Sequence, residues 1–205
     1  MCAKHAFMKI PRPLVLATAS EARRKLVSDL GLEFSTTAVD IDETCIVGEH
    51  VRDYVKRLAI QKSAAVLTAP EKAVIITVDT AIGLGSEIIG KPTNEDDAKR
   101  ILKLLSGKLH DVVSAICVRD NELGTERTET TLTEVEFSNL SDEMVDWYLA
   151  TDEWRGRAGA YAIQGKGITL VKDINGCLTN VIGISIPTLI ELLMDSFERS
   201  YLTVS

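Results

Sequence analysis

The stretch that decides the fold is "VIITVDTAIGLGSEIIGKP", residues 74–92. Val74 to Val78 form a continuous run that favours a buried β-strand, and Asp79 comes directly after it. In parallel α/β sheets, ligands bind at the carboxyl ends of the strands. We therefore expect a strand that ends at Asp79 and presents this acid to a cleft. A turn or a helix cap at Asp79 and Thr80 explains the same pattern equally well.

The second half of this stretch contains the pattern GxxxxGK, from Gly85 to Lys91. This pattern is typical of a phosphate-binding P-loop, but Pro92 occupies the place of the Ser or Thr that reaches Mg²⁺. Residues 87–89 favour a hairpin strand, so we predict a hairpin and no P-loop. Because Pro92 biases Lys91 to extended backbone, Lys91 is either a rigidly placed cation of a binding site or a lysine at a surface turn.

Strand and helix patterns alternate from this stretch toward both ends of the chain. The predicted strands are at residues 14–17, 74–78, 111–120, 128–137 and 168–176, with an extended segment at 34–44. The predicted helices are one between a cap at Ser20 and a stop at Gly31, and others at 51–69, 95–107, 141–151 (capped by Ser141) and 186–197. The order of these elements predicts an α/β protein, of mixed α+β type, with a mixed sheet.

The composition indicates one domain and limits the kinds of partner. A chain of 205 residues that is 45% hydrophobic can bury one sizeable core. A formal charge of −7 disfavours nucleic acid as the main partner. We expect a leader at residues 1–13, a single domain at 14–195 and a tail at 196–205.

The first residues lack the apolar region of a signal peptide, and no window is apolar enough to span a membrane, so we expect a soluble, cytoplasmic protein.

The four cysteines and three histidines have none of the spacings that bind zinc. A catalytic metal would therefore need carboxylates. The segment "DIDE", from Asp40 to Glu43, and Asp79 supply carboxylates that suit a hard divalent cation.

Two cations lie where the local pattern does not require them. Lys62 falls inside the apolar stripe of its predicted helix, where it either extends out to solvent or faces a cleft that holds an anion. Arg23 lies in the first turn of the helix that Ser20 caps. The free N–H groups there attract phosphate, although a solvated arginine beside an ordinary cap is the simpler interpretation. With Lys91, these residues supply three cations suited to a polyphosphate.

These motifs resemble those of the Maf-like nucleotide pyrophosphatases over residues 14–193. The matching segments are "LATASEAR" (16–23), "DE" (42–43), "QK" (61–62), "VDT" (78–80), "GKP" (90–92), "LSGKLH" (105–110), "AGAYAIQG" (158–165) and "NVIG" (180–183). The resemblance implies an elongated, two-lobed fold with a central mixed sheet and flanking helices, similar to that of the inosine triphosphate pyrophosphatases. It also implies a homodimer.

The implied activity is hydrolysis of nucleoside triphosphates to the monophosphate and pyrophosphate. By this resemblance, Asp79 is the proton acceptor or a metal ligand, and Glu43 lies near a divalent cation, Mg²⁺ or Mn²⁺. The residues implied to surround the substrate phosphates are Ser20, Arg23, Lys62 and Lys91. Two alternatives stay open: a pyrophosphatase for another nucleotide, such as a methylated purine triphosphate, and a non-catalytic nucleotide-binding regulator of cell division.

Three positions distinguish substrate types within the resembling family, and here they hold Ala22, Thr80 and Gln164. The dTTP/UTP type has Arg, Thr and Gln at these positions, whereas the 7-methyl-GTP type has Trp, Gln and Glu. Two of the three positions, Thr80 and Gln164, therefore favour dTTP and UTP as substrates. Ala22 departs from the pattern, because a methyl group replaces an arginine with five donors. Glu21 is a second departure, since it would oppose a nearby anion unless it turns away or helps to hold the metal.

Overall fold

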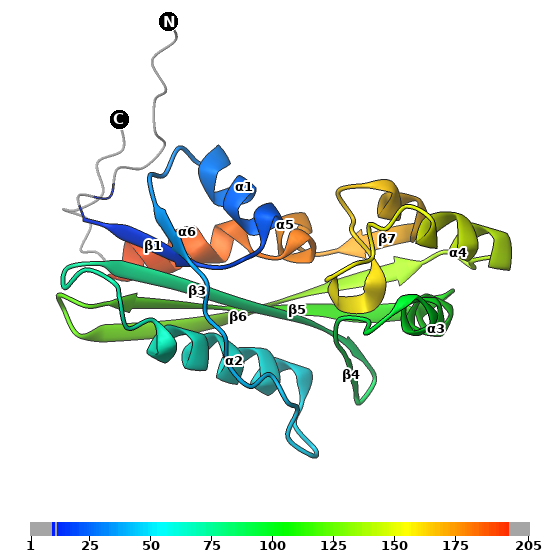
Figure 1. The fold of residues 1–205 in the computed structure, drawn as a ribbon, viewed down its shortest axis with the longest axis horizontal. Helices are drawn as coiled ribbons and strands as arrows, with labels where there is room; N and C mark the ends of the chain where they lie inside the picture. Colours follow the sequence, from blue (N-terminus) through cyan, green and yellow to red (C-terminus); the bar gives the residue numbers. More distant parts are fainter. Residues whose placement is uncertain (1–9, 11, 197–205) are drawn as a thin grey trace, which may run out of the picture.

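The computed structural model describes residue 10 and residues 12–196. The protein is elongated, and one mixed sheet runs along its length (Figure 1). The strands are β1 (Leu14–Ala17), β2 (Ser35–Thr37), β3 (Val74–Leu84), β4 (Glu87–Ile89), β5 (Leu109–Asp120), β6 (Thr125–Phe137) and β7 (Val171–Asn175). Their order is β2-β1-β3-β5-β6-β7, with β4 paired to β3. Strands β2, β1 and β3 are parallel and the other pairs are antiparallel, so the predicted mixed sheet is confirmed.

Helices pack on both faces of this sheet. They are α1 (Glu21–Asp29), α2 (Val51–Ala65), α3 (Glu95–Leu105), α4 (Asp142–Leu149), α5 (Leu178–Ile182) and α6 (Ile186–Ser196), with 3₁₀ turns η1 (Ala158–Ala160) and η2 (Lys166–Leu170). The predicted caps are confirmed: Ser20 accepts from the N–H of Arg23, and Ser141 accepts from that of Met144. Gly31 follows the end of α1 with a φ of 76°, a conformation that glycine adopts without strain.

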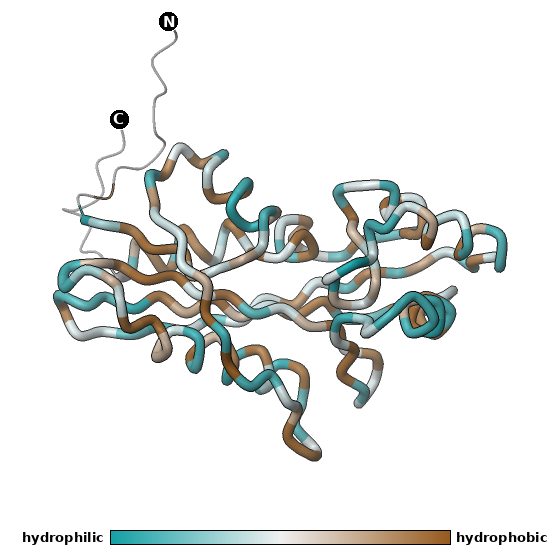
Figure 2. Tube along the Cα trace, in the orientation of Figure 1, coloured by the Kyte–Doolittle hydropathy of each residue, from teal (hydrophilic) through white to brown (hydrophobic). Residues whose placement is uncertain are grey.

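The hydrophobic residues form cores in two lobes. In the first lobe, α1 and α6 cover one face of β1 and β3, while α2 covers the opposite face of β3 and β5. In the second lobe, α3, α4 and η1 pack around the far ends of β5 and β6, with Phe137 and Tyr148 among the largest buried side chains. Figure 2 shows hydrophobic segments along the central strands. None of the helices in the described part of the chain combines the length and apolar character that a membrane span needs.

Strand β3 is longer than predicted, and Asp79 lies in its middle. The prediction of a strand that ends at this acid was wrong, because β5 pairs with β3 from Val74 to Gly83 and sustains the strand past the polar residues. The parallel partner β1 does end here, since its last pair is Ala17 with Thr77. The sheet edge therefore opens beside Asp79 at the carboxyl end of β1.

Other elements differ from the prediction at their ends. The hairpin of β3 and β4 is confirmed, and Gly85 turns the chain with a φ of 61°. Helix α2 ends at Ala65, not at residue 69. Residues 168–170, predicted as the start of a strand, belong to η2 instead, because the chain doubles back so closely that a Cβ on Gly167 would lie 2.5 Å from the carbonyl oxygen of Ala162. Helix α5 was not predicted. The predicted leader and tail, and residue 197 of the last helix, lie almost entirely outside the described residues.

Candidate active site

A cavity of about 1080 Å³ lies where the two lobes meet, beside the middle of β3. The first lobe contributes the loop from β1 into α1, parts of the 39–43 segment and α2. The second lobe contributes residue 153 and residues 155–158 and 161–165, and Gly90 and Lys91 follow β4 into the lining. The predicted site residues Ser20, Arg23, Glu43, Lys62, Asp79, Thr80, Lys91 and Gln164 all line this cavity.

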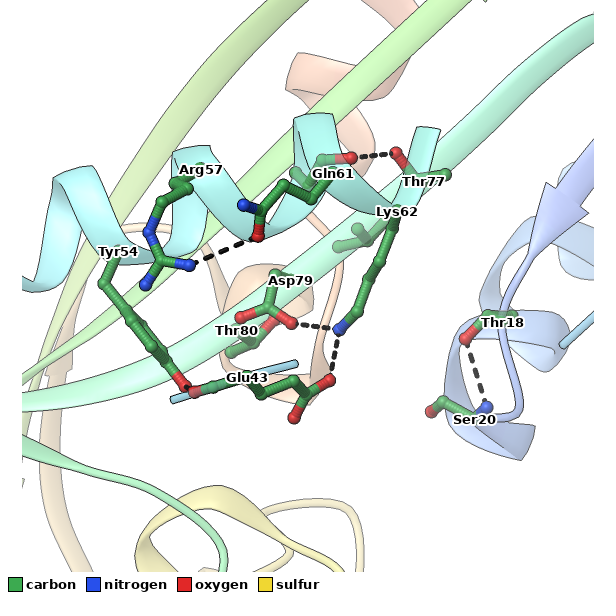
Figure 3. A network of polar contacts seen from close by, with 12 residues as sticks. Thr18, Ser20, Glu43, Tyr54, Arg57, Gln61, Lys62, Thr77, Asp79 and Thr80 are labelled. Atoms are coloured by element: carbon green, nitrogen blue, oxygen red, sulfur yellow. Dashed lines mark hydrogen bonds and ion pairs between the residues drawn. The ribbon is translucent and has the colours of Figure 1, made fainter. Parts of the chain in front are cut away.

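Lys62 and Asp79 form a close ion pair in this cavity. The amine of Lys62, from α2, lies 2.5 Å from a carboxylate oxygen of Asp79. Both side chains are shielded, with 12% of the Lys62 side chain and 9% of the Asp79 side chain exposed. Lys62 thus points inward, as Figure 3 shows, and does not extend out to solvent. The anion expected in front of this lysine is supplied, in the structure, by the protein itself.

Glu43 is the second carboxylate on the same amine. One of its oxygens lies 2.6 Å from Lys62 Nζ, and the other lies 3.5 Å from Lys91 Nζ. The backbone of this segment is held to α2, because the hydroxyl of Tyr54 donates to the carbonyl of Glu43 at 2.9 Å (Figure 3). Partial burial acts to raise the pKa of Glu43, but the two lysines outweigh burial and hold it below its usual value.

The pKa of Asp79 is shifted in the opposite direction. Burial raises the pKa of Asp79 above its usual value, and the opposing effects of Lys62 and Arg23 do not cancel this shift. Desolvation disfavours the charged form of a carboxyl group, which makes its carboxylate a stronger proton acceptor. The two neighbouring acids therefore differ in character: Glu43 stays ionised with its lysines, whereas Asp79 is the more basic of the two.

Arg23 is held by neutral acceptors of the protein. Its guanidinium donates to the carbonyl of Gly183 at 2.8 Å, to the carbonyl of Val78 at 3.1 Å and to the hydroxyl of Thr80 at 2.9 Å. The carbonyl of Val78 is available to Arg23 because strand β1 has already ended, its last pair with β3 being Ala17 with Thr77. Burial lowers the pKa of Arg23 from its usual value, against the attraction of Asp79 and Glu43. The arginine is thus fixed at the sheet edge, and no carboxylate of the described residues forms an ion pair with it.

The three predicted specificity positions have different surroundings. Gln164 is exposed and lines the cavity. The hydroxyl of Thr80 donates to the carbonyl of Gly183 at 3.2 Å while it accepts from Arg23, so its polar atom positions the arginine. Ala22 is buried within α1 and is not part of the cavity lining. Its exposed neighbour Glu21 does line the cavity.

Sequence reasoning missed several lining residues. Tyr54, Glu153 and Arg157 carried no pattern of their own, although Arg157 directly precedes the segment "AGAYAIQG". A carboxylate oxygen of Glu153 accepts from the N–H of Gly167 at 3.3 Å, which holds the turn that carries Gln164. A cation beside a glycine-rich motif was the one available signal, and it pointed to Arg157.

The carboxylates assigned to a metal, Glu43 and Asp79, converge on the amine of Lys62. Among the described residues, no group of three or more histidine, cysteine or acidic side chains has an arrangement that could hold a metal ion. Mg²⁺ is commonly bound by one or two carboxylates together with substrate phosphates. The donor set therefore fits a hard cation that arrives with a polyphosphate, and it does not fit a metal held by protein ligands alone.

The chain is similar to known proteins over most of its length. A family model described as "Maf-like protein" matches residues 13–196. The chain is 43% identical to a dTTP/UTP pyrophosphatase of Anaeromyxobacter dehalogenans (strain 2CP-1 / ATCC BAA-258) over 182 residues. This aligned region covers 88% of this chain and 92% of the relative. It is 40% identical over 194 residues to a dTTP/UTP pyrophosphatase of Shewanella sp. (strain MR-7), covering 91% and 99%. A protein of the same name from Sphingopyxis alaskensis is 42% identical over 172 residues, covering 83% and 90%.

Proposed function

The chain belongs to the Maf-like protein family, and we propose that it is a pyrophosphatase that hydrolyses dTTP and UTP to the nucleoside monophosphate and pyrophosphate. The observation that carries this proposal is the convergence of Asp79 and Glu43 on the amine of Lys62 inside a cavity of nucleotide size. The relatives named dTTP/UTP pyrophosphatase support the choice of substrate.

The triphosphate binds among the cations of the cavity. Arg23, Lys62 and Lys91 come from α1, α2 and the turn after β4, so they surround the phosphates from different elements. Their charge lowers the barrier because pyrophosphate becomes more anionic as it departs. Both lysines already bind carboxylates, so the anion competes with Glu43 and Asp79 for these amines.

Asp79 accepts the proton of the attacking water. The water oxygen bonds to the α-phosphorus, the bond from this phosphorus to the bridging oxygen breaks, and pyrophosphate leaves with that oxygen. The raised pKa of Asp79 supports this role, because a more basic carboxylate is a better proton acceptor. Glu43 and Asp79 are the residues that would hold a divalent cation, Mg²⁺ or Mn²⁺, which supplies further positive charge to the phosphates.

The base is recognised by the second lobe. Gln164 offers both a donor and an acceptor to a pyrimidine edge, and it stands exposed in the cavity. Ala22 replaces the arginine expected for this substrate type, but its burial separates it from the lining. If Gln164→Glu leaves the ranking of UTP, dTTP, CTP and 7-methyl-GTP unchanged, Gln164 does not select the base.

A panel of nucleoside triphosphates tests the function as a whole. The purified protein is assayed for pyrophosphate and for phosphate with dTTP, UTP, CTP and 7-methyl-GTP, with Mg²⁺, with Mn²⁺ and with EDTA. We expect pyrophosphate from dTTP and UTP, and loss of turnover in EDTA. Preference for 7-methyl-GTP would assign another substrate, and binding without turnover would favour a regulatory protein.

We also propose that the protein is a cytoplasmic homodimer. This proposal rests on the resemblance to the family. Light scattering coupled to size-exclusion chromatography measures the mass of the particle, and a monomer at micromolar concentration would contradict the dimer.

A further inference from the structure

Arg157 lines the cavity from the second lobe, and the proposed mechanism does not use it. Among the described residues, no carboxylate lies within ion-pair distance of its guanidinium. Arg155, two positions earlier, differs in this respect although it lines the same wall. Its guanidinium binds Asp152 at 2.8 Å and stacks 4.4 Å from the ring centroid of Trp154. Of these two arginines, only Arg157 is available to an anion in the cavity.

The backbone beside Arg157 is held tightly against β3 and β4. The N–H of Gly159 donates to the carbonyl of Gly90 at 3.0 Å, which ties this wall to the residue before Lys91. Gly159 also packs so closely on a side chain of β3 that a Cβ would lie 2.1 Å from Ile82 Cδ1. The arginine therefore belongs to a fixed wall of the cavity, anchored beside Lys91.

Arg157 faces a cavity that also contains the guanidinium of Arg23, whose hydrogen bonds go to neutral acceptors. Burial lowers the pKa of Arg23, the charges of Asp79 and Glu43 oppose this shift, and the charge of Arg157 adds a smaller lowering. Like charges in a partly buried site repel each other, and an anion bound between them removes this repulsion. The pair therefore favours a multiply charged anion over a neutral ligand.

We propose that Arg157 is a substrate-binding residue that holds the polyphosphate tail of the nucleotide from the second lobe, opposite Arg23. This inference rests on the proposed function. Guanidinium groups bind phosphate oxygens with two parallel hydrogen bonds, which gives both strength and orientation. Because the contact is to phosphate and not to the base, Arg157 contributes equally to dTTP and UTP.

Calorimetric titration with sodium tripolyphosphate in metal-free buffer tests this contact without turnover. The proteins are the unchanged chain, Arg157→Gln, Arg157→Lys and the control Arg155→Gln, which removes the same charge from the same wall. We expect Arg157→Gln to weaken binding by about tenfold or more, as loss of a charge-assisted hydrogen bond does. Arg157→Lys should recover part of the affinity, and Arg155→Gln should stay within about twofold of the unchanged chain.

Steady-state kinetics provide the second measurement. Arg157→Gln should lower kcat/KM for dTTP and UTP by the same factor, of about tenfold or more. Equal affinities of Arg157→Gln and Arg155→Gln for tripolyphosphate, or no binding by the unchanged chain, would overturn the inference. Failure of the proposed function has a different signature: neither nucleotide releases pyrophosphate, while the two arginine variants still differ in tripolyphosphate binding.

Discussion

The amine of Lys62 on α2 lies 2.5 Å from a carboxylate oxygen of Asp79 on β3. A second bond aligns the same helix and strand, because the hydroxyl of Thr77 donates to the carbonyl of Ala59 at 2.7 Å (Figure 3). Asp79 follows Thr77 on the same face of the strand, and Lys62 follows Ala59 by nearly one helical turn. The packing of α2 on β3 therefore places the lysine over the acid, and the chemistry of the site depends on it.

Asp79→Asn should remove activity and keep the fold. The amide preserves the shape but cannot accept the proton, so turnover of dTTP should fall by about 100-fold or more. Since burial raises the pKa of Asp79, its contribution to stability is greatest at low pH and is lost as pH rises through the folded-state pKa. At pH 8, the urea concentration at which half of the variant is unfolded should therefore be no lower than that of the unchanged chain. Near-normal release of pyrophosphate would remove Asp79 from the mechanism.

Lys62→Met should destabilise the protein by leaving the Asp79 carboxylate buried without its cation. Breaking a shielded ion pair in this way lowers the free energy of unfolding by about 3 kcal/mol. The double variant with Asp79→Asn should recover most of this loss, because the stranded charge is gone. Urea unfolding of the four proteins at pH 8 measures the coupling, and simple additivity of the effects of the two single substitutions would contradict it.

The buried side chain of Asn180 joins α5 to the sheet. Its amide donates to the carbonyls of Val112 at 2.9 Å and Thr131 at 3.3 Å. It also donates to the hydroxyl of Thr133 at 3.0 Å. Helix α5 ends at Ile182 and Gly183 caps it, so this anchor fixes a carbonyl that binds Arg23.

Asn180→Ala should lower the free energy of unfolding by about 2 to 4 kcal/mol, since it leaves several buried polar groups without a partner. The KM for dTTP should also rise, because the Gly183 carbonyl no longer holds Arg23 in place. Ser114→Ala is the matched control, since it removes only the hydroxyl that bonds the amide oxygen of Asn180. If both variants lose equal stability, the anchoring role of the amide is wrong.

Gly159→Ala should be far more harmful than Gly156→Ala. Both glycines have a φ of 69°, so the backbone strain of the substitution is the same in each. They differ in space: a Cβ on Gly159 meets Ile82 at 2.1 Å, whereas a Cβ on Gly156 has no neighbour within 4 Å. Thermal unfolding should show a larger decrease in Tm for Gly159→Ala, accompanied by weaker nucleotide binding. Equal decreases would show that close packing of this wall is unimportant.

His110 should make stability fall below neutral pH. Its ring is buried against Phe137 and lies 3.1 Å from the Tyr161 hydroxyl, and burial lowers its pKa to about 4. The unfolded chain binds a proton near pH 6.5, so the stability contributed by neutral His110 is complete above that pH and is lost as pH falls toward 4. The loss between pH 7.5 and pH 5 is about 2 kcal/mol from this residue.

The corresponding measurement compares the unchanged chain with His110→Gln. Urea unfolding at pH 7.5 and pH 5 gives the change in stability for each protein, and the difference between these changes isolates His110 from the carboxylates. The variant should lose about 2 kcal/mol less on acidification than the unchanged chain. Identical changes would mean that His110 titrates normally in the folded protein.

Much of the local structure was accessible to sequence reasoning, since its causes are local. Ser20 and Ser141 cap the helices that follow them, and the hairpin after β3 forms where the P-loop pattern fails. The helical period placed Lys62 within the apolar stripe of its helix, but it left open whether the amine extends out to solvent or faces a cleft. The length of β3 was missed, because a polar residue in a strand is tolerated when a partner strand and a covering lysine satisfy it.

The order of residues along the chain determined the mixed α/β class, the positions of most helices and strands, and a short set of charged residues with no role in a core. Tertiary structure decided which of these meet: Lys62 with both Asp79 and Glu43, Arg23 with the open edge of β3, and Arg157 with the same cavity. The reason is physical. Hydrophobic period and capping depend on neighbours within a few residues, whereas the distance between two charges depends on how separate elements pack.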